Sequence, residues 1–208
     1  MKLYCGIPIL ALLVLFGCDK MESKKTEASR PVISQARTIS KAEEAHSFCR
    51  SKNYNTDFCI LIDMSLHSGI NRLVVWDFKK KSIAQSCLVS HGCCGNPWSM
   101  DFSREKAGFS NIDGSHCTSL GKFRIGDRGY SQWGVNVKYV LHGLESSNRN
   151  ALKRAIVFHS WHAISDKEVY PDGCPEGWGC PAISNYNFKM IDPLIKSSSR
   201  PVLMWIYN

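Results

Sequence analysis

The chain has 208 residues, 44% of them hydrophobic, and a formal net charge of +8. This length accommodates one domain of ordinary size with an apolar core, and no second domain is needed. The basic balance favours encounter with anionic polymers by electrostatic steering, but the sequence has no basic stripe with interleaved aromatic residues and no nucleic-acid-reading motif. Nucleic acid is therefore excluded as the expected partner.

The N-terminus has the pattern of a bacterial lipoprotein signal. An apolar run from Ile7 to Phe16 suits a signal-peptide core and is short for a membrane span. The run ends in Leu15-Phe16-Gly17-Cys18, in which the cysteine would be lipid-modified. We predict a signal peptide over residues 1–17 and an acylated Cys18. This anchor would hold the protein at a membrane of the bacterial cell envelope, facing the periplasm or the extracellular side.

Residues 18–39 follow as a polar segment that is rich in Lys, Ser, Glu and Thr and has no hydrophobic period. Such a composition predicts a flexible tether after the lipid-modified cysteine. A folded domain is expected over residues 40–208. Its first element is predicted to be a helix from Ser40 to about Ser51, because Ser40 can cap it and Glu43 stands three residues later.

Seven later segments are rich in β-branched and aromatic residues and are bounded by Gly, Asn, Asp or Ser, which predicts strands. These segments are 58–63, 72–78, 82–91, 122–125, 135–142, 155–159 and 202–207. Many short strands favour a mainly β fold, either a β-sandwich or a partly open barrel, with a few short helices. A second helix is predicted from a Ser184 cap to about Ile195, with Asp192-Pro193 bending it or ending it early.

The segment from Gly92 to Gly121 is expected to be one long loop, rich in Gly, Ser and Asn. Loops of this length are usually functional or disordered. Its serine and asparagine side chains would either contact a ligand or satisfy turns, and the residue types alone leave both readings open.

The most informative motif is Gly179-Cys180-Pro181, with His159 upstream at the end of the apolar run 155–158. A cysteine and a histidine in one stretch can form a thiolate nucleophile and its base, and histidine titrates near neutrality. Gly179 leaves room for close approach to the backbone, and the N–H groups of Gly179 and Cys180 would bind a developing oxyanion. The alternative is that Cys180 is half of a disulfide and His159 a core residue.

The chain contains ten cysteines, and an exported protein favours disulfides. Setting aside Cys5, Cys18 and Cys180 leaves an odd number, so at least one thiol is free or pairs with another molecule. The pairings that sequence spacing allows are Cys49 with Cys59, Cys117 with Cys93 or Cys94, and Cys174 with Cys180, the last of which would block the nucleophile. Because adjacent cysteines suit a tetrahedral zinc ion poorly, no metal site is expected.

From Ile62 to the C-terminus, further motifs occur in a specific order. They include Val89-Ser90-His91-Gly92, Phe109-Ser110-Asn111, Ser119-Leu120-Gly121, His142-Gly143-Leu144-Glu145, the strand ending in His159, and Trp178-Gly179-Cys180-Pro181-Ala182. In these motifs the chain resembles the L,D-transpeptidase catalytic-domain family, the YkuD-like enzymes of bacterial cell walls.

This resemblance implies that Cys180 is the nucleophile and His159 its general base. The backbone carbonyl of Ser160 would orient the imidazole, and Gly179 and Cys180 would supply the oxyanion donors. The substrate-binding residues that it implies are Ser110, Asn111, Ser119 and Trp178, without a cofactor or metal. His162 competes as the base because its separation from Cys180 also suits the family pattern, and Gly177 departs from the usual Ser or Thr, which removes a hydroxyl that would brace the loop.

The implied activity is that of a peptidoglycan L,D-transpeptidase, which transfers the acyl group of a tetrapeptide stem from the Cys180 thioester to an acceptor amine. An L,D-carboxypeptidase would use water in place of the amine, and a catalytically silent cell-wall-binding lipoprotein is the alternative from another class. The expected partners are peptidoglycan stem peptides and, through Cys18, a membrane. The protein is expected to be a monomer.

Overall fold

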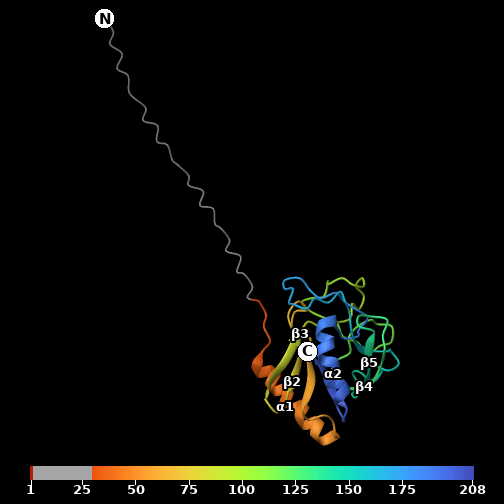
Figure 1. Ribbon diagram of the computed structural model, residues 1–208. Coiled ribbons are helices and arrows are strands. Elements are labelled where there is room, and N and C mark those ends of the chain that lie inside the picture. The colour runs from red at the N-terminus through yellow and green to blue at the C-terminus, as the bar shows by residue number, and fades with distance from the viewer. Residues whose placement is uncertain (2–29) are drawn as a thin grey trace.

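One curled β-sheet organises the chain (Figure 1). The computed structural model describes Met1 and residues 30–208, so Cys18 and, apart from Met1, the predicted signal peptide lie outside the described residues. The elements in chain order are α1 (Gln35–Lys52), β1 (Phe58–Asp63), β2 (Leu73–Asp77), β3 (Ser82–Cys87), β4 (Gly121–Tyr130), β5 (Val137–Gly143), β6 (Val157–Ser160), β7 (Ala182–Ile183), α2 (Asn185–Ser197) and β8 (Val202–Tyr207). Neither helix in these ranges is long and apolar enough to cross a membrane.

The eight strands are ordered β3-β2-β1-β8-β4-β5-β6-β7. Neighbouring strands are antiparallel except for β1 with β8 and β6 with β7, which are parallel. The last strand, β8, therefore lies between β1 and β4 and joins the two halves of the sheet. β7 has only two residues, which is too short for a periodic pattern to reveal in the sequence.

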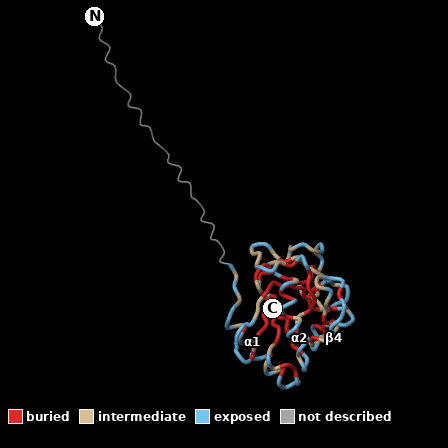
Figure 2. The backbone as a smooth tube through the Cα atoms, viewed as in Figure 1, coloured by how far each residue is buried: buried red, intermediate tan, exposed pale blue. Residues whose placement is uncertain are grey.

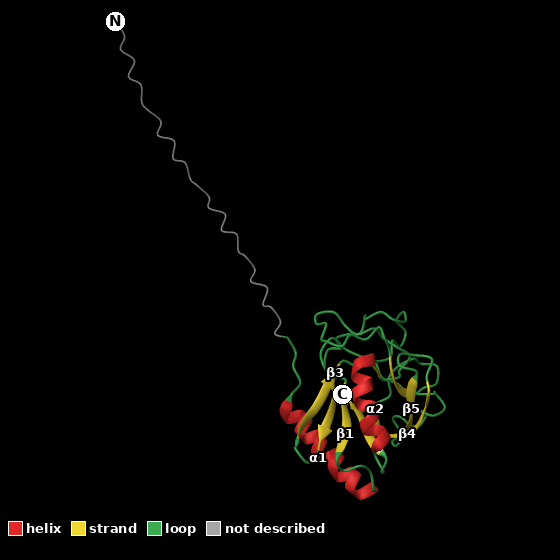
Figure 3. Ribbon diagram, viewed as in Figure 1, coloured by secondary structure: helices red, strands yellow, loops and turns green. Residues whose placement is uncertain are grey.

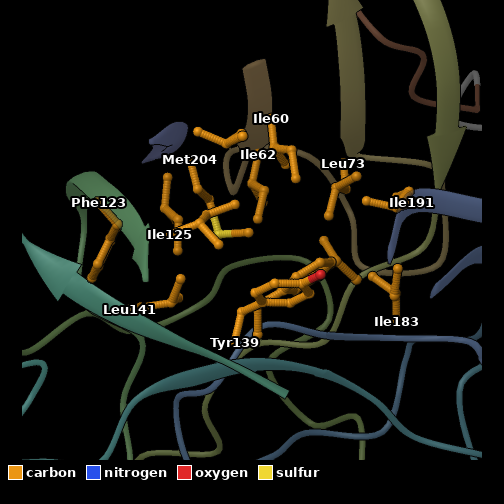
Figure 4. Close-up of a cluster of buried hydrophobic side chains, with 14 of the residues drawn as sticks. Ile60, Ile62, Leu73, Phe123, Ile125, Tyr139, Leu141, Ile183, Ile191 and Met204 are labelled. Carbon is orange, nitrogen blue, oxygen red and sulfur yellow. The ribbon is translucent and has the colours of Figure 1, made fainter. Parts of the chain in front are cut away.

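Both halves of the sheet contribute side chains to one apolar core (Figure 4). Ile60 and Ile62 of β1 pack in this core with Phe123 of β4, Leu141 of β5 and Phe188 of α2. Strands from the two halves can share one core only because the sheet curls around it. The mainly β prediction is confirmed, in the form of a partly open barrel made from a single sheet.

Helix α1 covers the outer face of β1, β2 and β8. The residues of β1 that alternate with the inner ones, Cys59 and Leu61, pack against Ala42, Ala45 and Cys49 of α1. Both faces of this part of the sheet are therefore buried, and Figure 2 shows the interior of the domain in red. The alternation follows from the two-residue period of a strand.

The start of α1 corrects the sequence interpretation. The helix begins at Gln35 with Ser34 as its N-cap, so residues 35–39, which were expected to belong to the tether, are helical, and Ser40 lies inside the helix. The buried face begins with Thr38, followed by Ala42 and Ala45. Thr and Ala carry little hydrophobic signal, which explains why the periodicity upstream of residue 40 escaped notice.

Helix α2 begins at its Ser184 cap as expected, and its buried face includes Phe188, Ile191 and Ile195. It does not end early, because it continues through Pro193 to Ser197. A proline removes one N–H and leaves the carbonyl four residues before it without a helical partner. That residue is Lys189, which is exposed like Pro193, so water can bind the freed carbonyl while the buried face holds the helix in place.

Long loops gather at one end of the sheet, where Figure 3 shows them in green. Two segments that are distant in sequence meet there, since Gly92 forms a parallel bridge with Gly177. Gly177 donates its N–H to the His91 carbonyl at 2.8 Å and accepts from the Cys93 N–H at 2.7 Å. The Gly-Cys-Pro motif is thus held against the start of the long loop.

Candidate active site

His159 lies on β6 and is fixed by its neighbour. Its Nδ1 atom is 3.0 Å from the backbone carbonyl oxygen of Ser160. Because a carbonyl only accepts, Nδ1 carries the proton and Nε2 keeps a free lone pair. The Ser160 hydroxyl in turn accepts from the Val135 N–H at 2.9 Å. This geometry fits the orienting role that the resemblance implies for the Ser160 carbonyl.

Cys180 follows a glycine whose backbone requires the absence of a side chain. Gly179 has φ of +96°, and a Cβ added to it would lie 2.4 Å from the Cys117 carbonyl oxygen. The half-buried thiol accepts from the Val157 N–H at 3.4 Å and donates to the Ala155 carbonyl at 3.9 Å. The Sγ atom would have to turn toward His159 for proton transfer, and catalytic hydrogen bonds often tighten only when substrate binds.

The oxyanion donors expected from the sequence are free to bind a ligand. Within residues 30–208, the N–H groups of Gly179 and Cys180 donate no hydrogen bond to another protein group. Backbone N–H groups that are already fixed in place need no reorganisation when negative charge develops beside them.

Cys180 and His159 lie where two hollows meet. The larger is a cleft of about 560 Å³, and its lining includes Ser131, Trp133, Lys138, Ala155 and Val157. The smaller, the tryptophan hollow, has a volume of about 110 Å³ and is lined chiefly by Ser90, Trp98, Trp133, Trp161, Gly177 and Trp178. Both hollows also contain His159 and Cys180 in their walls, so two different groups can reach the thiol from different sides.

The electrostatics of the pair keep both groups neutral at rest. Burial raises the pKa of the Cys180 thiol, against the Val157 hydrogen bond and the positive charges of Arg154 and Lys138. Burial also lowers the pKa of His159, against its hydrogen bond to Ser160, and Lys138 lowers it further. An uncharged thiol beside an uncharged, oriented imidazole is the starting state for general-base catalysis.

The structure assigns bracing contacts to three of the four residues expected to bind substrate. Ser119 donates its hydroxyl to the Ser110 carbonyl at 3.0 Å, and Asn111 bonds to Ser146 and Asn150. None of the three lines either hollow. Trp178 does line the tryptophan hollow, and it is 60% exposed. The geometry therefore favours turn bracing for Ser110, Asn111 and Ser119, and keeps Trp178 as a binding candidate.

Arg154 holds these loops beside the thiol. Its guanidinium donates to the Ser110 carbonyl at 2.9 Å, the Ser119 hydroxyl at 2.6 Å and the Cys117 carbonyl at 2.6 Å. The sequence motifs alone assign no role to Arg154. The tryptophans were also missed as a group, because Trp98, Trp133 and Trp161 are far apart in sequence yet their rings lie 5.3–6.1 Å from one another.

Within residues 30–208, the structure forms only one of the disulfide pairings considered for the sequence. Cys117 is bonded to Cys94, one of its two expected partners. Cys49 and Cys59 are both free, and so are Cys174 and Cys180. Cys174 is buried in a small cluster with Leu88, Trp161, Ile164 and Ala182, whereas Cys180 packs against the main core. The blocking bridge between Cys174 and Cys180 is therefore not formed.

The competing base, His162, is poorly placed. It lies in an exposed turn after β6 and lines neither hollow. Gly177 replaces the usual Ser or Thr, and a Cβ added to it would lie 4.0 Å from its nearest neighbours, the His91 carbonyl and the Ser90 hydroxyl. A side chain would fit at this position, so space does not explain the glycine.

A partly open barrel that brings an oriented histidine and a cysteine to one cleft has the groups that acyl transfer through a thioester requires. A sequence model of the L,D-transpeptidase catalytic domain matches residues 29–207. The chain belongs to this family, and the match includes α1 as well as the sheet. No curated protein sequence matches the chain.

The solved structures that are similar to the chain have low sequence identity. The helical cell shape determining protein Pgp2 of Campylobacter jejuni, as its K307A mutant, is 13% identical, with a TM-score of 0.47 over 85% of this chain and 57% of its own. The L,D-transpeptidase of Mycobacterium smegmatis is 10% identical, with a TM-score of 0.42 over 73% and 59%. That of Xylanimonas cellulosilytica is 9% identical, with 0.41 over 77% and 68%. The chain spans about half the length of Pgp2 and of the Bdellovibrio bacteriovorus protein Bd1075, another solved structure that matches it.

Proposed function

We propose that the protein is a peptidoglycan L,D-transpeptidase that acts through a Cys180 thioester on a tetrapeptide stem. Membership of the L,D-transpeptidase family supports the reaction class. The observation that carries the assignment of residues is the His159 imidazole, which is oriented by the Ser160 carbonyl and shares both hollows with Cys180.

In the first half-reaction, Nε2 of His159 takes the thiol proton and the Cys180 sulfur attacks the carbonyl at the L-centre of diaminopimelate. The N–H groups of Gly179 and Cys180 stabilise the tetrahedral oxyanion. His159 then returns the proton to the amine of the departing D-alanine, and a thioester remains on Cys180. Lys138 in the wall of the cleft supplies a positive charge for a carboxylate of the stem.

In the second half-reaction, an acceptor amine attacks the thioester, His159 takes its proton, and the thiol is regenerated with a new peptide bond. The two hollows provide separate routes to the same carbonyl, as two peptides require. The L,D-carboxypeptidase alternative, in which water resolves the thioester, would use the same catalytic groups.

Product analysis tests the proposal. Purified protein incubated with disaccharide tetrapeptides should release D-alanine and form cross-linked dimers that contain a bond between two diaminopimelate residues. Mass spectrometry of the muropeptides distinguishes the outcomes. Tripeptides without dimers would indicate carboxypeptidase activity. Tetrapeptides that stay unchanged after incubation with the intact protein would favour a binding protein without catalysis.

We also propose that the protein is anchored through an acylated Cys18, on the sequence pattern Leu15-Phe16-Gly17-Cys18. The cellular protein should then begin at a lipid-modified Cys18 and partition into detergent. Cys18→Ala should lose the lipid and accumulate as unprocessed precursor. Intact-mass measurement of the membrane fraction checks both, and a wild-type N-terminus beyond residue 18 without lipid would contradict the anchor.

A further inference from the structure

A chain of polar groups runs behind the cleft and ends in the loop that carries Cys180. Its members are Arg72, His91, Ser103 and Glu176. Arg72 is 1% exposed, and His91 and Glu176 are 0% exposed. None of the four lines the cleft or the tryptophan hollow, so the mechanism above does not use them.

Each hydrogen bond among these four residues is donated in the direction that leads from Arg72 to Glu176. Nη2 of Arg72 lies 2.8 Å from Nδ1 of His91, and a guanidinium only donates, so Nδ1 accepts and Nε2 carries the proton. Nε2 lies 2.8 Å from the Ser103 hydroxyl, which donates to Oε1 of Glu176 at 2.8 Å. Burial and the charge of Arg72 lower the pKa of His91 to about 3, so the imidazole stays neutral.

The chain joins a buried cation to a buried carboxylate. The other hydrogen bonds of Arg72 go to the carbonyls of Leu66 and Val89. Only His91 and Ser103 connect its charge by hydrogen bonds to Glu176 within the described residues. Buried charges are tolerated when they are paired and hydrogen-bonded, which makes each link of the chain sensitive to removal.

This chain clamps the loop on the N-terminal side of the nucleophile. Glu176 donates its N–H to the Met100 carbonyl at 2.7 Å, and its carboxylate accepts from the Ser103 N–H at 2.5 Å. On the other side of Cys180, the Ser90 hydroxyl donates to the Cys180 carbonyl at 3.4 Å and accepts from the Ala182 N–H at 3.1 Å. Hydrogen bonds therefore fix the loop on both sides of Cys180.

The geometry points to His91, Ser103 and Glu176 as positioning residues that set the N–H groups of Gly179 and Cys180 toward the developing oxyanion. They touch neither substrate nor the reacting atoms, and they act through the loop. The inference rests on the proposed role of Cys180. A misplacement of about 1 Å in such a site costs about 10²-fold in rate, so the clamp matters even at a distance.

Two substitutions remove links with little change in side-chain volume. Ser103→Ala deletes the hydroxyl but keeps the Ser103 N–H bond to Glu176, and Glu176→Gln removes the charge but keeps an oxygen acceptor. The readouts are kcat and KM for D-alanine release from a disaccharide tetrapeptide, the rate of Cys180 alkylation by iodoacetamide, and Tm. Alkylation requires the thiolate but forms no oxyanion, so it separates the two effects.

Both variants should lower kcat about 10- to 100-fold, with KM and the alkylation rate within about 3-fold of wild type. Ser103→Thr restores a hydroxyl and should recover most of kcat. Ser165→Ala is the matched control, because the Ser165 hydroxyl also makes a hydrogen bond within a loop, accepting from the Lys167 N–H, but lies away from the clamp.

Wild-type kcat in folded Ser103→Ala protein would overturn the inference. So would an equal fall in alkylation rate, because the effect would then lie on the thiol and not on the oxyanion donors. If Glu176→Gln folds, the same measurements on it test the inference. If it does not fold, Ser103→Ala alone tests the inference. A wild-type protein that neither turns over nor alkylates at Cys180 would contradict the proposed function instead.

Discussion

Cys180→Ser should keep the fold and lose donor turnover by about 10³-fold or more, because a serine hydroxyl at this position has no comparable nucleophilicity without a stronger base. The substitution changes one atom in a half-buried side chain, so a loss of this size cannot come from packing. Circular dichroism and Tm verify the fold, and D-alanine release measures the loss.

A carbapenem provides an independent readout for the same residue. It should add its mass to wild-type protein by acylating Cys180, and leave Cys180→Ser unchanged. Cys49→Ala is the matched control, since Cys49 is a free thiol on the buried face of α1, and this variant should be acylated like wild type. Peptide mapping that places the adduct on another cysteine would show that Cys180 is not the nucleophile.

His159→Ala should lower kcat by about 10²- to 10⁴-fold, the usual range for removal of a general base. His162→Ala serves as the control and should have little effect, because His162 lies in an exposed turn outside both hollows. The reverse ranking of the two variants would transfer the role of base to His162.

The pH profile of wild type gives the same residue a second test. Only the neutral imidazole accepts a proton, and burial lowers the pKa of His159. The neutral form therefore persists at lower pH than in a free histidine, and the acid limb of kcat/KM should lie below the pKa of about 6.5 of an unperturbed histidine. An acid limb above that value would contradict a buried, neutral base.

The strands that have a clear two-residue period or a complete apolar run could be predicted from sequence, and Phe58–Asp63 and Val202–Tyr207 have the expected bounds. The start of α1 could not, because its first buried positions carry small or polar side chains. A single residue decides whether Cys93 or Cys94 pairs with Cys117, and only the backbone geometry selects Cys94.

The pair Cys180 and His159 could be proposed from a motif because both residues lie in one C-terminal stretch. The tryptophan hollow and the clamp could not be inferred in that way. Trp98 and Trp161 meet only after the long loop folds over β6 and β7, and Glu176 looks like an ordinary surface residue until its side chain is seen to be buried. Tertiary contacts between distant segments create both features.

The position of β8 constrains how the domain can be made. β8 is the final strand of the sheet in sequence but lies between β1 and β4. The two halves of the sheet therefore cannot pair through β8 until residues 202–207 have left the ribosome. Nearly all of the domain must be translated before its non-local contacts can form. Until β8 is in place, the edges of β1 and β4 that it covers stay unpaired.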